Sequence, residues 1–125
     1  MNLDNGRWLN KPNKSFIDSE TVEITTEPGT DLWQKSYYGF QNDNAHALVF
    51  TQKDNFTFTT HISFDYRELF DQCGLLMYVD CDNWFKASIE YDNKRHSRLG
   101  SVVTNFGYSD WATQDIATIT SIWYR

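Results

Sequence analysis

The sequence predicts an all-β fold, an antiparallel two-sheet β-sandwich or jelly roll formed by one domain over residues 1–125. Apolar and polar residues alternate with a period of two through most of the chain, as in strands with one buried face. No stretch carries the sustained apolar stripe of an amphipathic helix. A length of 125 residues corresponds to one domain. With 5 Trp, 7 Tyr and 9 Phe, the chain has more rings than a small core requires. We therefore expect some rings to line a groove or an interface.

Seven segments are predicted as strands: 21–29, 46–52, 55–66, 74–80, 84–91, 98–107 and 117–125. Segment 55–66 has the clearest alternation, with phenylalanine and isoleucine on one side of the strand and threonine, serine and aspartate on the other. Pro28-Gly29 ends the first segment, and 66–72 allows one helical turn at most. Asp82-Asn83 is a tight-turn pair, which predicts an antiparallel hairpin from 74–80 and 84–91.

Strand 84–91 presents two chemically different faces. The alternation places Trp84, Lys86, Ser88 and Glu90 on one side. The other side is a core face formed by Phe85, Ala87, Ile89 and Tyr91. The first set is therefore either a solvent-exposed face or the floor of a binding site.

The charge of the chain excludes two classes of partner. A net charge of −6 opposes binding to nucleic acid and to anionic membranes. The only basic concentration is Lys94, Arg95, His96 and Arg98, which we interpret as a solvated hairpin loop because no glycine-rich cradle accompanies it. No segment approaches transmembrane length or resembles a signal peptide.

Cys73 and Cys81 flank segment 74–80, so a straight strand holds them about 26 Å apart. That separation excludes a disulfide, whose Cα atoms lie within about 7 Å. Free thiols and the lack of a signal peptide together predict a cytoplasmic protein.

The residues offer little for catalysis. Cysteine and histidine lack metal-ligand spacing, and no nucleophile motif is present, so we expect no metal, no cofactor and no catalytic residues. Glycoside hydrolysis requires only two carboxylates across a cleft. Asp80 and Asp82 with Glu90 facing them across the hairpin are one such set, although the two aspartates also suit a strand end and turn.

Binding of a saccharide without hydrolysis requires less. A pyranose stacks on Trp or Tyr and pairs its hydroxyls with polar side chains. The residues that supply this chemistry are Tyr78, Trp84, Lys86, Glu90, Asp110 and Trp111. The alternative is structural, with Lys86 and Glu90 as an ion pair and the tryptophans as core plugs.

Three strings, at 31–48, 71–91 and 99–115, resemble a family of intracellular concanavalin A-like proteins classed as a domain of unknown function, DUF1349, which includes regulation-of-enolase-like proteins. The resemblance runs from Trp8 to Arg125, and its most specific parts are N-W-x-K-x-x-x-E-Y at 83–91 and S-D-W at 109–111. It implies a jelly roll of the lectin and glucanase type whose concave sheet carries any ligand. Ser88 stands where relatives often have glycine, which argues against the same close approach of a ligand to that strand. The E-x-D-x-E string of related laminarinase-like glucanases is absent, which argues against hydrolysis by that mechanism. The recurrent family positions fall on Trp33, His46, Trp84, Lys86, Glu90, Ser109, Asp110 and Trp111.

Three functions follow as hypotheses. The first is a non-catalytic binder of a saccharide or similar polar small molecule. The second is a protein-interaction or regulatory module with a groove or a sheet edge as its docking surface. The third is a glycoside-active enzyme. Segment 117–125 reads as a strand that stops without a closing turn, leaving Ile119 and Trp123 uncovered. We therefore expect either a truncated form of a longer domain or a homo-oligomer.

Overall fold

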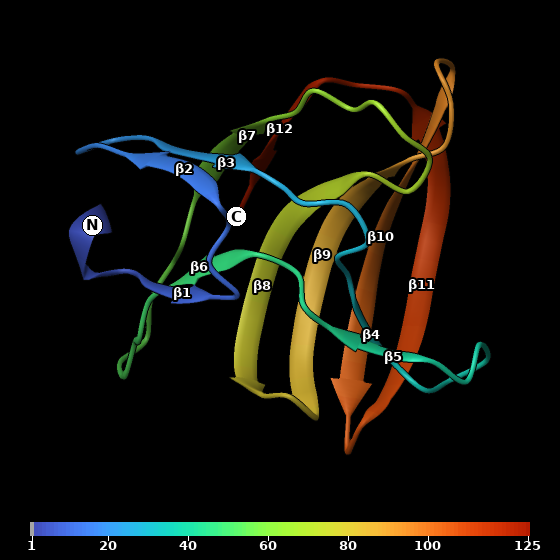
Figure 1. Cartoon of the computed structure of the whole chain (residues 1–125), viewed down its shortest axis with the longest axis horizontal. Helices are drawn as coiled ribbons and strands as arrows, with labels where there is room; N and C mark the ends of the chain where they lie inside the picture. The colour runs from blue at the N-terminus through green and yellow to red at the C-terminus, as the bar shows by residue number, and fades with distance from the viewer. Residues whose placement is uncertain (1) are drawn as a thin grey trace. The chain divides into compact units, whose positions relative to one another are not determined.

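The computed structural model describes residues 2–125, and they form an all-β structure (Figure 1). These residues contain no α-helix and one short 3-10 helix, η1 (Leu3–Asn5). Every strand pair is antiparallel, so the predicted all-β antiparallel fold is confirmed. No helix within 2–125 is long and apolar enough to cross a membrane. The chain divides into two compact units, and the boundary in the sequence lies between Asp54 and Asn55. That the chain is one domain stays a prediction.

The first unit consists of three two-stranded pairs, β1 with β6, β2 with β3 and β4 with β5. Asp18 closes the turn between β2 and β3, because its Oδ1 accepts the backbone N–H groups of Glu20 and Thr21 at 2.8 and 2.7 Å. The strands of this unit are β1 (Arg7–Leu9), β2 (Lys14–Ile17), β3 (Val22–Thr25), β4 (Leu32–Gln34), β5 (Gln41–Asp43) and β6 (Ala47–Val49).

The second unit is built on a four-stranded sheet in the order β11-β10-β9-β8 (Figure 1). Sequential strands are neighbours, which makes the sheet a meander of hairpins. A two-stranded pair, β7 with β12, completes the unit. The strands are β7 (Thr60–Ser63), β8 (Gln72–Asp80), β9 (Asn83–Tyr91), β10 (His96–Asn105), β11 (Tyr108–Ala117) and β12 (Ser121–Tyr124).

One asparagine joins two hairpin turns at the same end of this sheet. Asn83 donates from Nδ2 to Asp80 Oδ1 at 2.8 Å, and its Oδ1 accepts the Phe106 N–H at 3.1 Å. Gly107 N–H donates to Asp82 O at 2.9 Å, which is a second link between the β8–β9 and β10–β11 turns. Because the two turns are tied together, the register of all four strands is set at this end.

A layer of aromatic rings covers the opposite end of the sheet. The Tyr66 ring stacks on Tyr91 with centroids 5.3 Å apart, and the Tyr66 hydroxyl lies 3.5 Å from Ile89 O. Ile89 is fully buried and Tyr124 of β12 is 8% exposed. Burial, with a smaller contribution from Cys73, raises the pKa of Tyr124 to about 12 and also raises that of Tyr66. These phenols are therefore part of the core of the second unit.

The structure corrects several boundaries. Only Thr60–Ser63 of segment 55–66 pairs as a strand. Residues 55–59 alternate in sequence but pair with no other strand, and Phe56 is 57% exposed. The strand predicted over 117–125 is shorter, because β12 begins at Ser121. Trp123 is 69% exposed, as predicted, whereas Ile119 is half-buried. The β8–β9 hairpin is confirmed, but its turn is Cys81-Asp82, and Asn83 already pairs with Asp80.

One further expectation is confirmed and another holds in part. Five strands within residues 2–125 were missed: β1, β2, β4, β5 and β11. Both cysteines are free. The predicted basic loop is right for Lys94 and Arg95, which lie in a hairpin connection where Asn93 Oδ1 accepts the N–H groups of Arg95 and His96 at 2.9 and 3.1 Å. It is wrong for His96 and Arg98, which belong to β10, and Arg98 is half-buried. Strand β11 was not predicted, because its sequence YSDWATQDIA lacks a continuous apolar face.

Replacing Asn83 tests the link between the two turns. We expect Asn83→Ala to lower the free energy of unfolding by about 1 to 3 kcal/mol, since two hydrogen bonds are lost. Urea denaturation followed by far-ultraviolet circular dichroism measures this change. Asn105→Ala, at an exposed site near the same turns, is the matched control. Equal stabilities for the two variants would contradict the role assigned to Asn83.

The buried phenols predict a loss of stability in alkali. Because the pKa of Tyr124 is higher in the folded state than in the unfolded chain, folding favours the neutral phenol. The neutral phenol therefore contributes fully to the free energy of unfolding below pH 10, and this contribution falls as the pH rises toward 12. We expect unfolding free energies measured from pH 9 to pH 11.5 to fall less steeply in Tyr124→Phe than in the parent chain. Tyr37→Phe is the control, because Tyr37 is 93% exposed. An unchanged slope in Tyr124→Phe would refute this account.

Candidate functional site

The four-stranded sheet has a polar face whose residues come from all four strands. Cross-strand pairing sets Glu90 beside Gln72 and Arg98, and Arg98 beside Asp115. One row further along, Ser88 lies between Gly74 and Gly100. The polar face is formed by Gln72, Gly74, Leu76, Tyr78, Trp84, Lys86, Ser88, Glu90, Arg98, Gly100, Val102, Thr104, Ser109, Trp111, Thr113 and Asp115.

Arg98 is the centre of the charged part of the polar face. Its guanidinium lies 3.6 Å from Glu90 Oε1 and 3.9 Å from Asp92 Oδ1. The same group lies 5.8 Å from the ring centroid of Trp111, which is within the range of a cation–π contact. Arg98 was not predicted as a site residue. The sequence signal that could have found it is its spacing of two from Gly100, which puts both on one face of β10, the face that Glu90 shares.

Gly100 determines where the Trp111 ring lies. A Cβ at position 100 would be 2.8 Å from Trp111 Nε1, so the indole passes over the bare backbone of β10. Any other residue at this position would displace the ring. The half-buried indole and the guanidinium beside it therefore depend on this one glycine.

Trp84 is buried rather than open to solvent. It is 4% exposed, and its indole N–H has no hydrogen-bond partner among residues 2–125. Lys86 Nζ lies 6.0 Å from its ring centroid. Strand β9 therefore buries residues on both sides, because Ile89 on the opposite face is fully buried as well.

The structure gathers some of the predicted site residues and separates others. Lys86, Glu90 and Trp111 are half-buried on the polar face, together with Tyr78. Ser109 is there too, but it is buried and shares a 2.6 Å hydrogen bond with Thr104. Asp110 lies on the other face of the sheet, because it follows Ser109 and precedes Trp111 in one strand.

The other two predicted residues belong to the first unit. Trp33 is 8% exposed and donates from Nε1 to Ser36 O at 3.0 Å. His46 Nδ1 donates to Asn10 O at 2.6 Å, and its Nε2 lies 2.5 Å from Glu27 Oε2. The His46 side chain is 6% exposed, so it acts here as a link between loops of its own unit.

The carboxylates considered for glycoside hydrolysis are not brought together. Asp80 lies beside Asn83 at one end of β9, and Glu90 is seven residues further along that strand, about 23 Å away. Hydrolysis needs about 5 to 9.5 Å between the two carboxyl groups. Asp80 instead caps the turn: hydrogen bonds from the Asn83 side chain and then the Asp82 N–H lower its pKa.

The opposite face of the sheet carries an apolar end. Met77, Phe85 and Val103 form one cross-strand row, which Asp110 completes on β11. Tyr108 lies on the same face, opposite Asn105 in the neighbouring row. Met77 is 63% exposed, Val103 50% and Tyr108 60%, although each is apolar in character. The rings of Tyr66 and Tyr124 cover the Ile89 end of this face, and the apolar end is left in contact with solvent.

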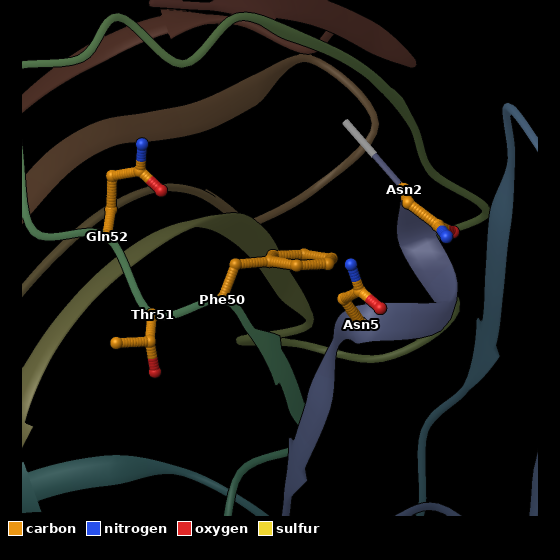
Figure 2. A pocket seen from close by; sticks show the side chains of 5 residues that line it. All are labelled: Asn2, Asn5, Phe50, Thr51 and Gln52. Atoms are coloured by element: carbon orange, nitrogen blue, oxygen red, sulfur yellow. The ribbon is translucent and has the colours of Figure 1, made fainter.

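A small hollow in the first unit has none of the predicted residues. It is lined by Asn2, Asn5, Phe50, Thr51 and Gln52, and Figure 2 shows the Phe50 ring reaching toward Asn5. Its volume of ≈ 140 Å³ is well below the roughly 300 to 1,000 Å³ typical of ligand pockets. We therefore place the candidate site on the sheet.

Comparison with known proteins places the chain among relatives of undefined activity. A family described as "Protein of unknown function (DUF1349)" matches residues 8–125. "Regulation of enolase protein 1" from Saccharomyces cerevisiae is 39% identical over 111 residues, which are 89% of this chain and 55% of that protein. The chain therefore spans about half the length of this curated relative. A crystal structure of a functionally unknown protein from S. cerevisiae matches with a TM-score of 0.78 and 31% identity, over 98% of this chain and 66% of that one.

Proposed function

This chain belongs to the family described as protein of unknown function (DUF1349), and from that premise we propose that it is a non-catalytic regulatory protein that acts by binding another protein. Enolase is the first candidate partner, because the chain is similar to a protein named for regulation of enolase. A cytoplasmic location is part of the proposal, and the two free cysteines support it.

The apolar end of the sheet is the observation that carries the proposal. Met77, Val103 and Tyr108 lie together on one face with half or more of each side chain exposed. A contiguous apolar patch on a soluble protein marks an interaction surface, since its exposure to water is unfavourable. Large side chains such as Met and Tyr are enriched at the centre of protein interfaces.

The distribution of carboxylates supports the non-catalytic part. Asp80 is engaged in the turn, and Glu90 is held beside Arg98. Burial raises the pKa of the Cys73 thiol, which makes it a poor nucleophile near neutral pH.

Binding to purified enolase tests the proposal. We expect the double variant Met77→Glu/Val103→Glu to weaken binding at least tenfold in isothermal titration calorimetry, because it places two charges in the apolar contact. Phe16→Glu is the matched control: Phe16 is also apolar and 57% exposed, but it lies in the first unit. Failure of the parent chain to bind enolase removes this partner, and equal binding by both variants removes the apolar end as the surface.

Saccharide binding is a second candidate, and the grouping on the polar face favours it. Trp111 supplies a half-buried ring, and Lys86, Glu90 and Arg98 supply donors and acceptors on the same side of the sheet. The burial of Trp84 leaves Trp111 and Tyr78 as the half-buried rings of this face, and Trp111 is the larger stacking surface.

A glycan array distinguishes this candidate from the first. If a sugar binds, we expect Trp111→Ala to weaken its affinity by about 1 to 3 kcal/mol through loss of the stacking surface. The control is Trp123→Ala, which removes an indole that is 69% exposed outside the four-stranded sheet. No binding across the array, or no effect of Trp111→Ala, would end this hypothesis.

A further inference from the structure

Strand β11 forms a long, regular edge of the four-stranded sheet. It pairs with β10 over ten consecutive residue pairs without a register shift, whereas the other edge, β8, is interrupted by a bulge between Tyr78 and Asp80. Figure 1 shows β11 along one side of the sheet, and no strand within residues 2–125 pairs with its outer side. Its outward N–H and C=O groups therefore form a template for another strand.

The middle of this edge is open to solvent and lacks the usual protection of an edge strand. Residues 112–115 are all exposed. Natural edges are commonly protected by Pro, by Lys, by a bulge or by short length. Strand β11 is ten residues long and contains neither Pro nor Lys. The edge is therefore suited to pairing with a further strand.

The two faces of β11 limit the registers in which a second copy of the chain can pair with it. Residues directly opposite one another in antiparallel strands lie on the same face of the sheet. Asp110 and Asp115 are five residues apart and lie on different faces, so no register sets one opposite the other. A two-fold axis between two copies of β11 must therefore pass through a residue.

The register centred on Ala112 gives compatible pairs on the face that carries Tyr108. Tyr108 lies opposite Ile116 of the second copy, which is a pair of an aromatic and a β-branched residue. Asp110 lies opposite Gln114 of the second copy, whose amide can donate to the carboxylate. The two-fold symmetry repeats both pairs.

The other face is compatible with the same register. Trp111 lies opposite Thr113 of the second copy, and Ser109 lies opposite Asp115. No two carboxylates face one another, and nine residues of each strand, 108–116, take part. One edge therefore supplies both members of every pair, which is the property that a two-fold interface between identical chains requires.

Neither the neighbouring register nor the net charge favours another arrangement. A register centred on Thr113 would set Asp110 opposite Ile116 and Asp115 opposite Trp111, so that each carboxylate faces an apolar group. Each copy has a net charge of −6. In the register centred on Ala112, however, the two Asp110 carboxylates lie about 13 Å apart along the strands, which exceeds the screening length of about 8 to 10 Å.

We propose that two copies of the chain pair through β11, antiparallel and centred on Ala112, and so join their four-stranded sheets into one continuous sheet. The inference goes beyond the proposed function. Strand pairing extends the sheet in its own plane, so the face that carries Met77 and Val103 stays uncovered. Tyr108 belongs to both surfaces, and the variants used below leave it unchanged.

Sedimentation equilibrium over a range of concentrations tests the pairing, with two variants at one exposed position. Gln114→Lys places a cation opposite Asp110 of the second copy, twice, and Gln114→Asp places a second carboxylate there. We expect the Lys variant to dimerise at least tenfold more tightly than the Asp variant, and the difference to narrow as salt increases. Ser121→Lys and Ser121→Asp make the same charge changes at an exposed site of β12, and we expect them to dimerise equally.

Cysteine cross-linking determines the register. The experiment uses the Cys81→Ser chain, because Cys81 is an exposed thiol. Ala112→Cys sets two thiols directly opposite one another, with Cα atoms about 4.5 to 5.5 Å apart and within reach of a disulfide. Thr113→Cys is the control, because its two Cα atoms are offset by two residues and lie about 8 Å apart. We expect oxidised glutathione to cross-link Ala112→Cys at least tenfold faster than Thr113→Cys.

Hydrogen exchange locates the interface in the parent chain. We expect exchange to slow within residues 108–116 as the concentration rises and to stay unchanged in β8, with circular dichroism as the check that each variant is folded. A chain that is monomeric at every concentration, equal dimerisation of the two Gln114 variants, faster cross-linking of Thr113→Cys, or protection in β8 would each overturn the inference. None of these measurements contains enolase, so loss of enolase binding with the dimer intact would refute the proposed function alone.

Discussion

The register of the four-stranded sheet is the constraint on which the other features depend. Asn83 and Gly107 tie the β8–β9 and β10–β11 turns together, so each strand enters the sheet at a defined position. Because side chains alternate with a period of two, a slip of one residue would exchange the two faces completely. Arg98, Glu90 and Trp111 would then leave the polar face, and Met77 and Val103 would enter it. A turn hydrogen bond thus determines the chemistry at strand centres many ångströms away.

The two ends of the opposite face differ because its aromatic cover is short. Tyr66 and Tyr124 reach Ile89, and this contact excludes water strongly enough to raise the pKa of both phenols. The row of Met77, Phe85 and Val103 has no comparable cover within its own unit, and Met77 and Val103 remain at least half exposed. The same face of the sheet is therefore part of the core at its Ile89 end. At the end with Met77 and Val103, it is the surface that we propose binds a partner.

Sugar stacking and protein docking place different demands on this sheet. Stacking needs an open ring, and the buried Trp84 cannot supply one, whereas Trp111 is positioned by Gly100 and bordered by Arg98. Docking needs exposed apolar area, and Met77, Val103 and Tyr108 of the apolar end supply it. The proposed protein binding therefore requires no rearrangement of the sheet.

The sequence by itself determined the all-β class, the β8–β9 hairpin and the division of β9 into a side with Trp84, Lys86 and Glu90 and a side with Phe85 and Ile89. These features are local, since they follow from alternation and turn residues within a few positions. Other features were decided only by the tertiary structure. Alternation in 55–59 predicted a strand, but this segment pairs with no other strand. In contrast, β11 has little apolar patterning, and it forms because all ten of its residues pair with residues of β10. The burial of Trp84, the distance between Asp80 and Glu90, and the ion pair of Glu90 with Arg98 likewise depend on which strands become neighbours. Pairing between strands is a non-local interaction, and the period-two pattern of one segment carries no information about the segment that will lie beside it.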